Sequence, residues 1–282
     1  MINIRHYFQL MRFDKPIGIF LLLWPTLWAL WLAAGGIPSL KILVIFILGV
    51  VIMRAAGCVM NDLIDRNIDK YVQRTQLRPL AVGTVGIIEA IMLFGILCLF
   101  ALVLAGLLNR LVIELAIVGI ILIVIYPFLK RVTYLTQFWL GLTFSWGVPI
   151  AFAAEQGVVP KIAWFLFVTA VLWPITYDTQ YAIMDREDDF KIGVKSMAIL
   201  FGHYDRLIIG LLQGGMLLLF GMLGMFLSLN YWFYLGLLIA LGFMIYQQVL
   251  IRYRKPENCF AAFRSNNYVG LVIFLGIFLT YI

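Results

Sequence analysis

Residues 61–78 read NDLIDRNIDKYVQRTQLR, a polar stretch that follows one apolar run and precedes another. Asn61, Asp65 and Asp69 recur at every fourth position, so on a continuing helix they share one face, with Asp62 beside them. Carboxylates in one row repel each other, and this arrangement is best tolerated when a cation lies against it. Oxygen ligands of this kind suit Mg²⁺ better than metals that prefer thiolate. The stretch therefore predicts a magnesium site.

Basic residues interleave with these carboxylates and follow them along the chain. They are Arg66, Lys70, Arg74 and Arg78. Cations placed in this way suit a phosphate group that arrives together with its metal ion. We therefore interpret the stretch as a site for Mg²⁺ and a diphosphate at the end of a membrane helix.

A second polar stretch, YDTQYAIMDREDD at residues 177–189, repeats this plan. Its Asp178, Tyr181, Asp185 and Asp189 are spaced by three, four and four residues, which places them on one face of a helix. Acidic neighbours and then two lysines accompany them, namely Glu187, Asp188, Lys191 and Lys195. Two such rows facing each other could hold more than one Mg²⁺, with the diphosphate of a substrate bridging the metals.

The composition is that of a membrane protein. Hydrophobic residues make up 64% of the chain and charged residues only 12%, whereas roughly a quarter of the residues in soluble domains are charged. A helix of about 18 or more apolar residues can span a bilayer. This criterion predicts an all-α, polytopic membrane protein with nine spans, at residues 17–35, 40–58, 85–107, 111–129, 137–154, 161–182, 206–228, 231–251 and 266–282.

Most of the 21 basic residues fall in alternate loops between these spans. The positive-inside rule then predicts a cytoplasmic amino terminus, an external carboxyl terminus and both polar stretches on the cytoplasmic side. The long loop that ends near Gly83 is expected to fold over the site as a lid. The net charge of +7 is explained by this topology and by attraction to anionic membrane lipid. Nucleic-acid binding would need a basic soluble domain, which the chain lacks.

Other polar residues near the predicted spans are candidates for either anchoring or substrate binding. Arg12 and Lys15 precede the first span, and Tyr126, Lys130 and Arg131 end the fourth, where a basic residue is also good helix-capping chemistry.

Arg54 lies inside the second span, where an unpaired charge is costly, so it is expected to pair with the carboxylates or with an anionic aromatic substrate. The three cysteines show no metal spacing and are given no role. The last three spans carry few polar groups, and we expect no chemistry there.

The two aspartate-rich motifs resemble those of the UbiA superfamily of membrane prenyltransferases, whose first motif is NDxxDxxxD and whose second is an aspartate cluster a little over a hundred residues later. The resemblance extends from Met11 to Ser196 and is greatest to the bacterial branch that prenylates 4-hydroxybenzoate. The similar segments are MRFDKPIGIFLLLWPTLWAL, AGCVMNDLIDRNIDKYVQRTQLRPLA, YPFLKRVTY, GLTFSWGVPIAFAA and YDTQYAIMDREDDFKIGVKS.

This resemblance implies one UbiA-type domain over residues 1–282, with nine transmembrane helices around a central cavity and capping loops on the cytoplasmic side of a bacterial inner membrane. The implied reaction uses Mg²⁺ and moves a polyprenyl group from polyprenyl diphosphate to the ring carbon ortho to the hydroxyl of 4-hydroxybenzoate, in ubiquinone biosynthesis. The sequence carries no signal for the oligomeric state or for the isoprenoid length.

The residues and the resemblance together define three groups of candidates. The expected catalytic residues are Asp65, Asp69, Asp178, Asp185, Asp189 and Arg131. The expected substrate-binding residues are Arg12, Lys15, Arg54, Arg66, Lys70, Arg74, Arg78, Tyr126, Lys130, Tyr181, Lys191 and Lys195. The expected metal ligands are Asn61, Asp62, Asp65, Asp69, Asp185, Asp188 and Asp189.

Two alternative functions remain open from the sequence. A cation transporter would explain carboxylates within the membrane, but the dense arginines and lysines after each row would repel its cation. Another member of the superfamily, with a naphthoate acceptor, would share both motifs. The segments RFDKPIG and YDTQYAIMDREDD favour the hydroxybenzoate branch.

Overall fold

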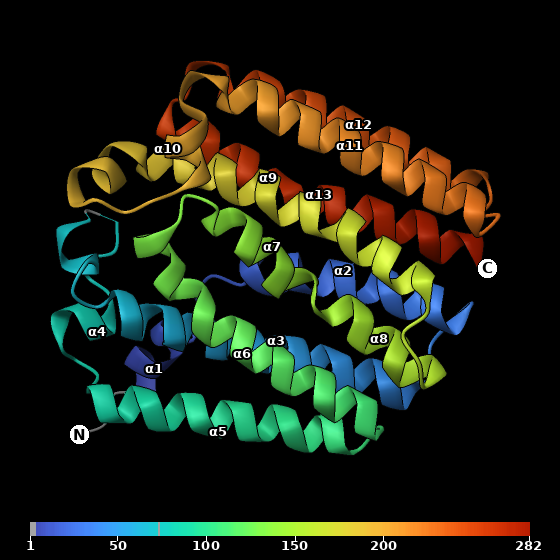
Figure 1. Ribbon diagram of the computed structural model, residues 1–282, viewed down its shortest axis with the longest axis horizontal. Coiled ribbons are helices and arrows are strands. Elements are labelled where there is room, and N and C mark those ends of the chain that lie inside the picture. The colour runs from blue at the N-terminus through green and yellow to red at the C-terminus, as the bar shows by residue number, and fades with distance from the viewer. Residues whose placement is uncertain (1–3, 73) are drawn as a thin grey trace.

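The computed structural model describes residues 4–72 and 74–282, and within them the chain is all-α, as predicted (Figure 1). The helices of the amino-terminal half are α1 (Ile4–Leu10), α2 (Ile17–Ala34), α3 (Leu40–Asp65), η1 (Asp69–Tyr71), α4 (Pro79–Val82), α5 (Ile87–Gly106) and α6 (Arg110–Val132). Those that follow are α7 (Thr136–Ser145), α8 (Gly147–Gln156), α9 (Lys161–Ile192), α10 (Met197–Phe201), η2 (Gly202–Tyr204), α11 (Asp205–Phe226), α12 (Tyr231–Leu250), η3 (Ile251–Tyr253) and α13 (Pro256–Thr280).

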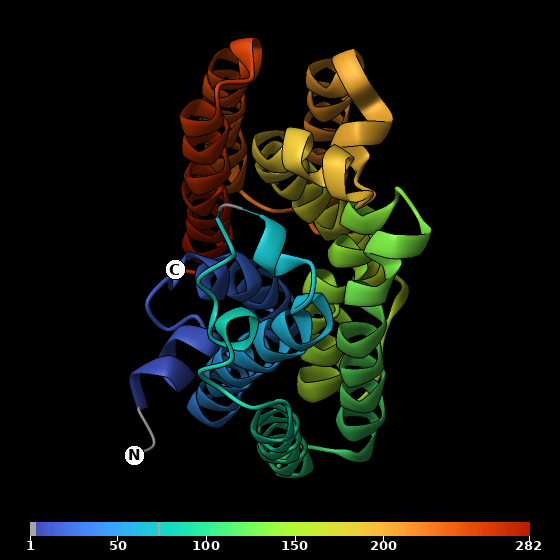
Figure 2. The same cartoon turned by 90° about the vertical axis from the view of Figure 1, so that its left-hand side faces the viewer.

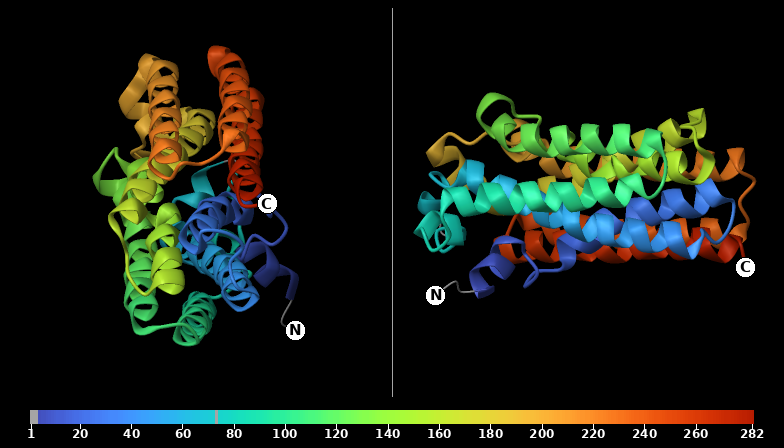
Figure 3. Two further views of the ribbon diagram at one scale, coloured as in Figure 1. Left: turned by 90° about the vertical axis from the view of Figure 1, so that its right-hand side faces the viewer. Right: turned by 90° about the horizontal axis from the view of Figure 1, so that it is seen from below.

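The long helices lie side by side as one bundle (Figure 1). The short elements α1, α4 and α10 gather at one end of it, whereas α13 ends at the opposite end (Figure 3). Within the described residues, eight helical segments are long and apolar enough to cross a membrane. The protein is therefore a multi-pass membrane protein, as its composition predicts.

The span expected at 137–154 consists of two ten-residue helices in series, α7 and α8. Pro149 has no N–H to offer the carbonyl of Ser145, which ends α7. Gly147 at the start of α8 lies so close to α2 that an added Cβ would be 2.6 Å from Thr26 Oγ1. The count of nine spans stays a prediction, because this segment is shorter and more broken than a single spanning helix.

The helices that carry the two polar stretches end differently from the prediction. The shared face of Asn61, Asp65 and Asp69 was predicted for a continuing helix, but α3 ends at Asp65, seven residues beyond the expected end of the span, and Asp69 begins the short helix η1. The last carbonyls of α3 accept hydrogen bonds from arginine side chains, which satisfies them without a further helical turn. In contrast, α9 continues to Ile192, ten residues beyond the expected end of the span, and carries the whole second row.

Aromatic packing joins α2 to α9 and α13. The rings of Trp28 and Trp173 are 5.1 Å apart, and the Trp28 indole N–H donates to the carbonyl of Gly270 at 3.0 Å. Gly270 permits this approach, because a Cβ there would lie 2.3 Å from a ring atom of Trp24. Burial of these large side chains fixes the α2 and α9 faces on which the site is built.

The last three long helices, α11, α12 and α13, take part in more buried hydrogen bonding than the sequence suggested. A buried amide network joins α9 to α11, α12 and α13: Gln180 and Gln213 both donate to Gln247, which donates to Ser265, and Asn266 donates to Gln180. Hydrogen bonds between membrane helices contribute about 0.6 kcal/mol each on average. Because Gln180 lies between Asp178 and Tyr181 in the chain, the network sets the position of the second polar row.

Candidate active site

A cavity of about 1520 Å³ extends into the bundle between the two polar stretches. Its walls come from α2, α3, α6, α7, α9 and α13, and from the loop after α3. Figure 2 looks onto the end of the bundle where this loop, in cyan, crosses near the centre. The fold therefore brings the two rows, more than a hundred residues apart in the sequence, to one space.

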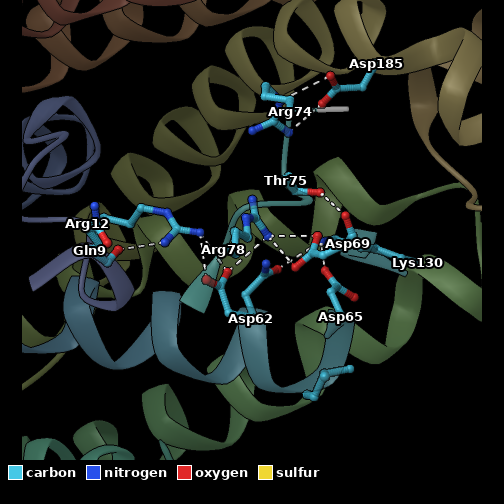
Figure 4. Close-up of polar contacts among 12 residues, drawn as sticks. Gln9, Arg12, Asp62, Asp65, Asp69, Arg74, Thr75, Arg78, Lys130 and Asp185 are labelled. Atoms are coloured by element: carbon cyan, nitrogen blue, oxygen red, sulfur yellow. Dashed lines mark hydrogen bonds and ion pairs between the residues drawn. The ribbon is translucent and has the colours of Figure 1, made fainter. Parts of the chain in front are cut away.

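Carboxylates of the first row are buried and paired with arginines (Figure 4). Asp62 is 1% exposed and accepts two hydrogen bonds of 2.8 Å from Arg12. Arg78 lies 2.9 Å from Asp69 and 3.0 Å from Asp62. Burial raises the pKa of Asp69 above the usual aspartate value, and the Arg78 guanidinium opposes that rise. These arginines supply the positive charge that a row of like charges requires.

Lys130 at the end of α6 contacts the same row. Its ammonium group donates to Asp65 at 2.6 Å and to Asn61 Oδ1 at 2.9 Å. Asp65 is 5% exposed, and its second oxygen, Oδ1, is buried without a hydrogen-bond partner. An unsatisfied carboxylate oxygen in a buried site is costly unless a ligand supplies its partner.

The second row is joined to the loop after α3. Arg74 donates from two nitrogens to the two oxygens of Asp185, at 3.2 and 2.6 Å, and its guanidinium lies 4.8 Å from the ring centre of Tyr181. Asp178 and Asp189 line the cavity on the same helix. The loop that was predicted to cover the site thus reaches across from α3 to α9 (Figure 4).

The donor set fits a hard cation. Asp65 Oδ1 lacks a hydrogen-bond partner, and Asn61, Asp69, Asp185 and Asp189, which also carry side-chain oxygens, line the same cavity. Mg²⁺ prefers carboxylate and amide oxygens and keeps several waters or substrate oxygens in its shell. Within the described residues, groups of three acidic, histidine or cysteine side chains do not converge on one point.

A second polar centre lies deeper in the cavity. The Nε of Arg54 is buried and without a partner, and its guanidinium lies 5.6 Å from the centre of the Phe144 ring. The Tyr177 hydroxyl is also buried and unpaired. Gly18 provides the space for the arginine, since a Cβ there would be 2.3 Å from Arg54 Nε. Unpaired donors beside aromatic rings suit an anionic aromatic ligand.

Most of the predicted site residues line the cavity, and five do not. Those that line it are Arg12, Lys15, Arg54, Asn61, Asp62, Asp65, Asp69, Arg74, Arg78, Tyr126, Lys130, Asp178, Tyr181, Asp185, Asp189 and Lys195. Arg66 and Arg131 line a separate groove. Lys70 is exposed, and Asp188 pairs with exposed Lys191 at 3.6 Å. The roles predicted for these five stay predictions that the geometry does not support.

Sequence reasoning missed residues that position the site residues without being predicted as site residues themselves. Asp205, at the start of α11, is fully buried and accepts hydrogen bonds from Arg186 on α9 and from Arg254 at 2.9 Å. Arg186 follows Asp185 directly, so this cluster holds the end of the second row in place. Nothing in the spacing of these residues reveals the pairing, because they belong to α9, to the start of α11 and to the end of η3, which are far apart in the sequence. Likewise Gly18 is visible in the sequence only as a glycine in an apolar helix.

Replacing Asp205 by asparagine should destabilise the protein. The change leaves the two partly buried arginines without their carboxylate, at a cost of about 2 kcal/mol. The thermal unfolding midpoint of the detergent-solubilised protein is expected to fall by about 5 °C. Glu114→Gln is the matched control, because its exposed pair with Arg110 contributes little. Equal midpoints for the two variants would contradict a structural role for the cluster.

Comparison with known proteins places this site in a family. The model of the UbiA prenyltransferase family matches residues 22–277. A 4-hydroxybenzoate octaprenyltransferase of Coxiella burnetii (strain CbuK_Q154) is 67% identical, with 100% of this chain and 99% of that protein covered. The 4-hydroxybenzoate octaprenyltransferase of Photobacterium profundum is 53% identical, with 98% and 96% covered.

Solved structures share the fold. A UbiA homologue from Aeropyrum pernix K1, in its apo form, has a TM-score of 0.81 and 24% identity, covering 93% of this chain and 97% of that one. A UbiA homologue from Archaeoglobus fulgidus, bound to GPP and Mg²⁺, has a TM-score of 0.72 and 18% identity, covering 95% and 99%.

Proposed function

Because this chain belongs to the UbiA prenyltransferase family, we propose that it transfers a polyprenyl group from polyprenyl diphosphate to the ring carbon ortho to the hydroxyl of 4-hydroxybenzoate, releasing diphosphate. One observation carries the proposal: a single cavity holds the cation-paired carboxylates at its mouth and the unpaired Arg54 among aromatic rings deeper in. The first end suits a metal-bound diphosphate, and the second suits an aromatic acid. The names of the relatives support this choice of acceptor.

At the mouth of the cavity, the chain's own cations bind the diphosphate. Arg12, Arg74, Arg78 and Lys130 all line this space and carry donors that match phosphate oxygens. The residues that would hold Mg²⁺ are Asn61, Asp65, Asp69, Asp185 and Asp189. When bound, Mg²⁺ supplies charge that stabilises the departing diphosphate. The Mg²⁺ bound to the homologue from Archaeoglobus fulgidus supports this assignment.

Deeper in the cavity, Arg54 binds the carboxylate of the acceptor and Phe144 packs against its ring. The bond between the allylic carbon and the diphosphate oxygen breaks, and its electron pair leaves with the oxygen. The ring carbon ortho to the hydroxyl donates the electron pair of the new carbon–carbon bond, and the ring then loses a proton. Asp178 and Asp185 line the same space and are the candidates for accepting it.

Apolar walls serve both the prenyl chain and the chemistry. The cavity continues between α3, α5 and α6, where Ala101, Leu104, Leu108 and Val112 line it. An apolar chain fits this branch, and its presence keeps water from the electron-poor allylic carbon.

The proposal includes a place in the cell. The charge bias of the loops supports a bacterial inner-membrane protein whose amino terminus and site face the cytoplasm. Prenylated 4-hydroxybenzoate is consumed in ubiquinone biosynthesis, which is the process we assign. The family match over residues 22–277 supports one domain spanning the whole chain.

The test is a prenylation assay with membranes that contain the full chain. Labelled 4-hydroxybenzoate, a polyprenyl diphosphate and Mg²⁺ should yield a lipid-soluble labelled product. EDTA and Asp65→Ala should each abolish it. Product from a dihydroxynaphthoate but not from 4-hydroxybenzoate would overturn the acceptor, and no product from any aromatic acceptor with inserted protein would overturn the enzyme.

Replacing Gly18 by alanine should weaken binding of the acceptor alone. The new methyl group would meet the Arg54 guanidinium at 2.3 to 2.7 Å and displace it. We expect the KM for 4-hydroxybenzoate to rise about tenfold, which corresponds to about 1.4 kcal/mol, while the KM for the prenyl diphosphate stays the same. Gly49→Ala is the matched control, because Gly49 lines the same cavity with open space around it. An unchanged KM for 4-hydroxybenzoate would contradict this role of Gly18.

A further inference from the structure

We propose that the groove between α3, α5 and α6 binds an anionic phospholipid, with Arg66 and Arg131 on its phosphate and its acyl chains along the apolar walls. The groove has a volume of about 460 Å³. It shares no lining residue with the large cavity: on α3 the groove is lined by Met60, Leu63 and Ile64, whereas the cavity is lined by Asn61, Asp62 and Asp65. Arg66, which the sequence placed among the substrate-binding residues, and Arg131, which it placed among the catalytic ones, therefore line this groove and not the large cavity.

The two guanidinium groups are held at one helix end. Arg66 donates to the carbonyl of Leu63 at 2.6 Å, and Arg131, from the end of α6, donates to the carbonyl of Ile64 at 2.8 Å. These are consecutive carbonyls in the last turn of α3, so the two side chains converge on one spot. A guanidinium has several N–H donors in a planar fork, and among the described residues Arg66 and Arg131 each make one side-chain hydrogen bond. The remaining donors are available to an anion.

The charge of this pair is not balanced by the protein. Among residues 4–72 and 74–282, no carboxylate lies within ion-pair distance of Arg66 or Arg131, whereas Arg12, Arg74, Arg78 and Lys130 all have one. Two adjacent cations repel each other, and a phosphate that bridges them removes this cost. The charge complementarity therefore points to an anionic occupant.

The walls of the groove identify that occupant as a lipid. Ile87 and Ile91 on α5 are 47% and 53% exposed, and Phe128 on α6 is 48% exposed. The helices α5 and α6 are the least buried of the long helices described, so this face meets the hydrocarbon of the membrane. A soluble anion would leave these side chains uncovered. A phospholipid matches both the arginine pair and the apolar walls. Its phosphate would contact the arginines, and its acyl chains would cover the isoleucines.

The experiment measures lipid retained by the full chain after detergent purification. Protein is exposed to an equal mixture of phosphatidylglycerol and phosphatidylcholine, and the bound lipids are counted by native mass spectrometry. Wild-type protein should retain phosphatidylglycerol preferentially. The double variant Arg66→Gln, Arg131→Gln should lose that preference by roughly 10- to 30-fold. The double variant Arg206→Gln, Arg252→Gln is the matched control, with the same loss of charge at exposed residues outside the groove.

A groove-filling variant separates a lipid from a free phosphate. Ile91→Trp keeps both arginines but occupies the apolar part, so it should lower phosphatidylglycerol retention. Inorganic phosphate in excess should not displace the lipid from the wild-type protein. Equal retention by the wild type and the Arg66→Gln, Arg131→Gln variant would overturn the proposal, as would an equal loss in the Arg206→Gln, Arg252→Gln control. Displacement by inorganic phosphate would also overturn it, in favour of a soluble anion.

Discussion

Replacing Asp65 by asparagine should lower kcat/KM for the polyprenyl diphosphate by about 1000-fold, because the site loses charge stabilisation that acts on the departing diphosphate. Asparagine keeps the size of the side chain but removes its charge. Asp65 is buried, holds Lys130 at 2.6 Å and leaves Oδ1 without a partner. The loss should therefore be accompanied by a higher Mg²⁺ concentration for half-maximal rate, measured by titrating Mg²⁺ in the prenylation assay.

Asp188→Asn provides the matched control for this variant. Asp188 belongs to the second aspartate cluster in the sequence, but the structure pairs it with Lys191 at the surface and leaves it out of the cavity lining. We expect its rate and its Mg²⁺ requirement to stay within about threefold of wild type, since exposed ion pairs contribute little. If Asp188→Asn were as damaging as Asp65→Asn, the assignment of the metal ligands would be wrong.

Replacing Arg54 by methionine should raise the KM for 4-hydroxybenzoate by about 100-fold. A buried arginine that binds a carboxylate typically contributes several kcal/mol, part of which is the cost of leaving the carboxylate unpaired. Methionine keeps much of the apolar stem but lacks the guanidinium, which lies 5.6 Å from the centre of the Phe144 ring. Steady-state kinetics with each substrate varied in turn will show whether the change is confined to the acceptor.

An acceptor without a carboxylate tests the same contact from the other side. With 4-hydroxybenzyl alcohol in place of 4-hydroxybenzoate, wild-type enzyme and Arg54→Met should have similar KM values, because the charged partner is missing in both cases. A large difference with the alcohol would mean that Arg54 acts by another route, such as holding α2 through Gly18.

Much of the fold was predictable from the sequence. The eight long helices follow from apolar runs of spanning length, since backbone hydrogen bonds must be satisfied within a helix when lipid surrounds it. Most of the candidate site was predictable for a related reason. Helical periodicity places Asp178, Tyr181, Asp185 and Asp189 on one face whatever that face meets, and the structure puts all four in the cavity lining.

The exceptions depend on neighbours that are distant in the chain. The end of α3 at Asp65 depends on Arg131, which arrives from α6 to bond the Ile64 carbonyl. Arg66 and Lys70 belong to the same motif as Asp65, yet neither lines the cavity, because a helix that ends turns its next residues in new directions. The break between α7 and α8 follows from Pro149 and from close packing on Thr26, and only the former is visible locally.

What the sequence determined by itself is therefore the set of spanning helices, the two rows of carboxylates and their chemical character. These features depend on residue type and local period, which the backbone of a helix imposes. Only the tertiary structure decided which cation pairs with which carboxylate. It also decided that Asp205 accepts a hydrogen bond from Arg186, and that Arg66 and Arg131 line a separate groove and not the cavity. Those outcomes depend on how helices far apart in sequence pack together, since a charged side chain in a membrane protein orients toward whichever partner or cavity the packing provides.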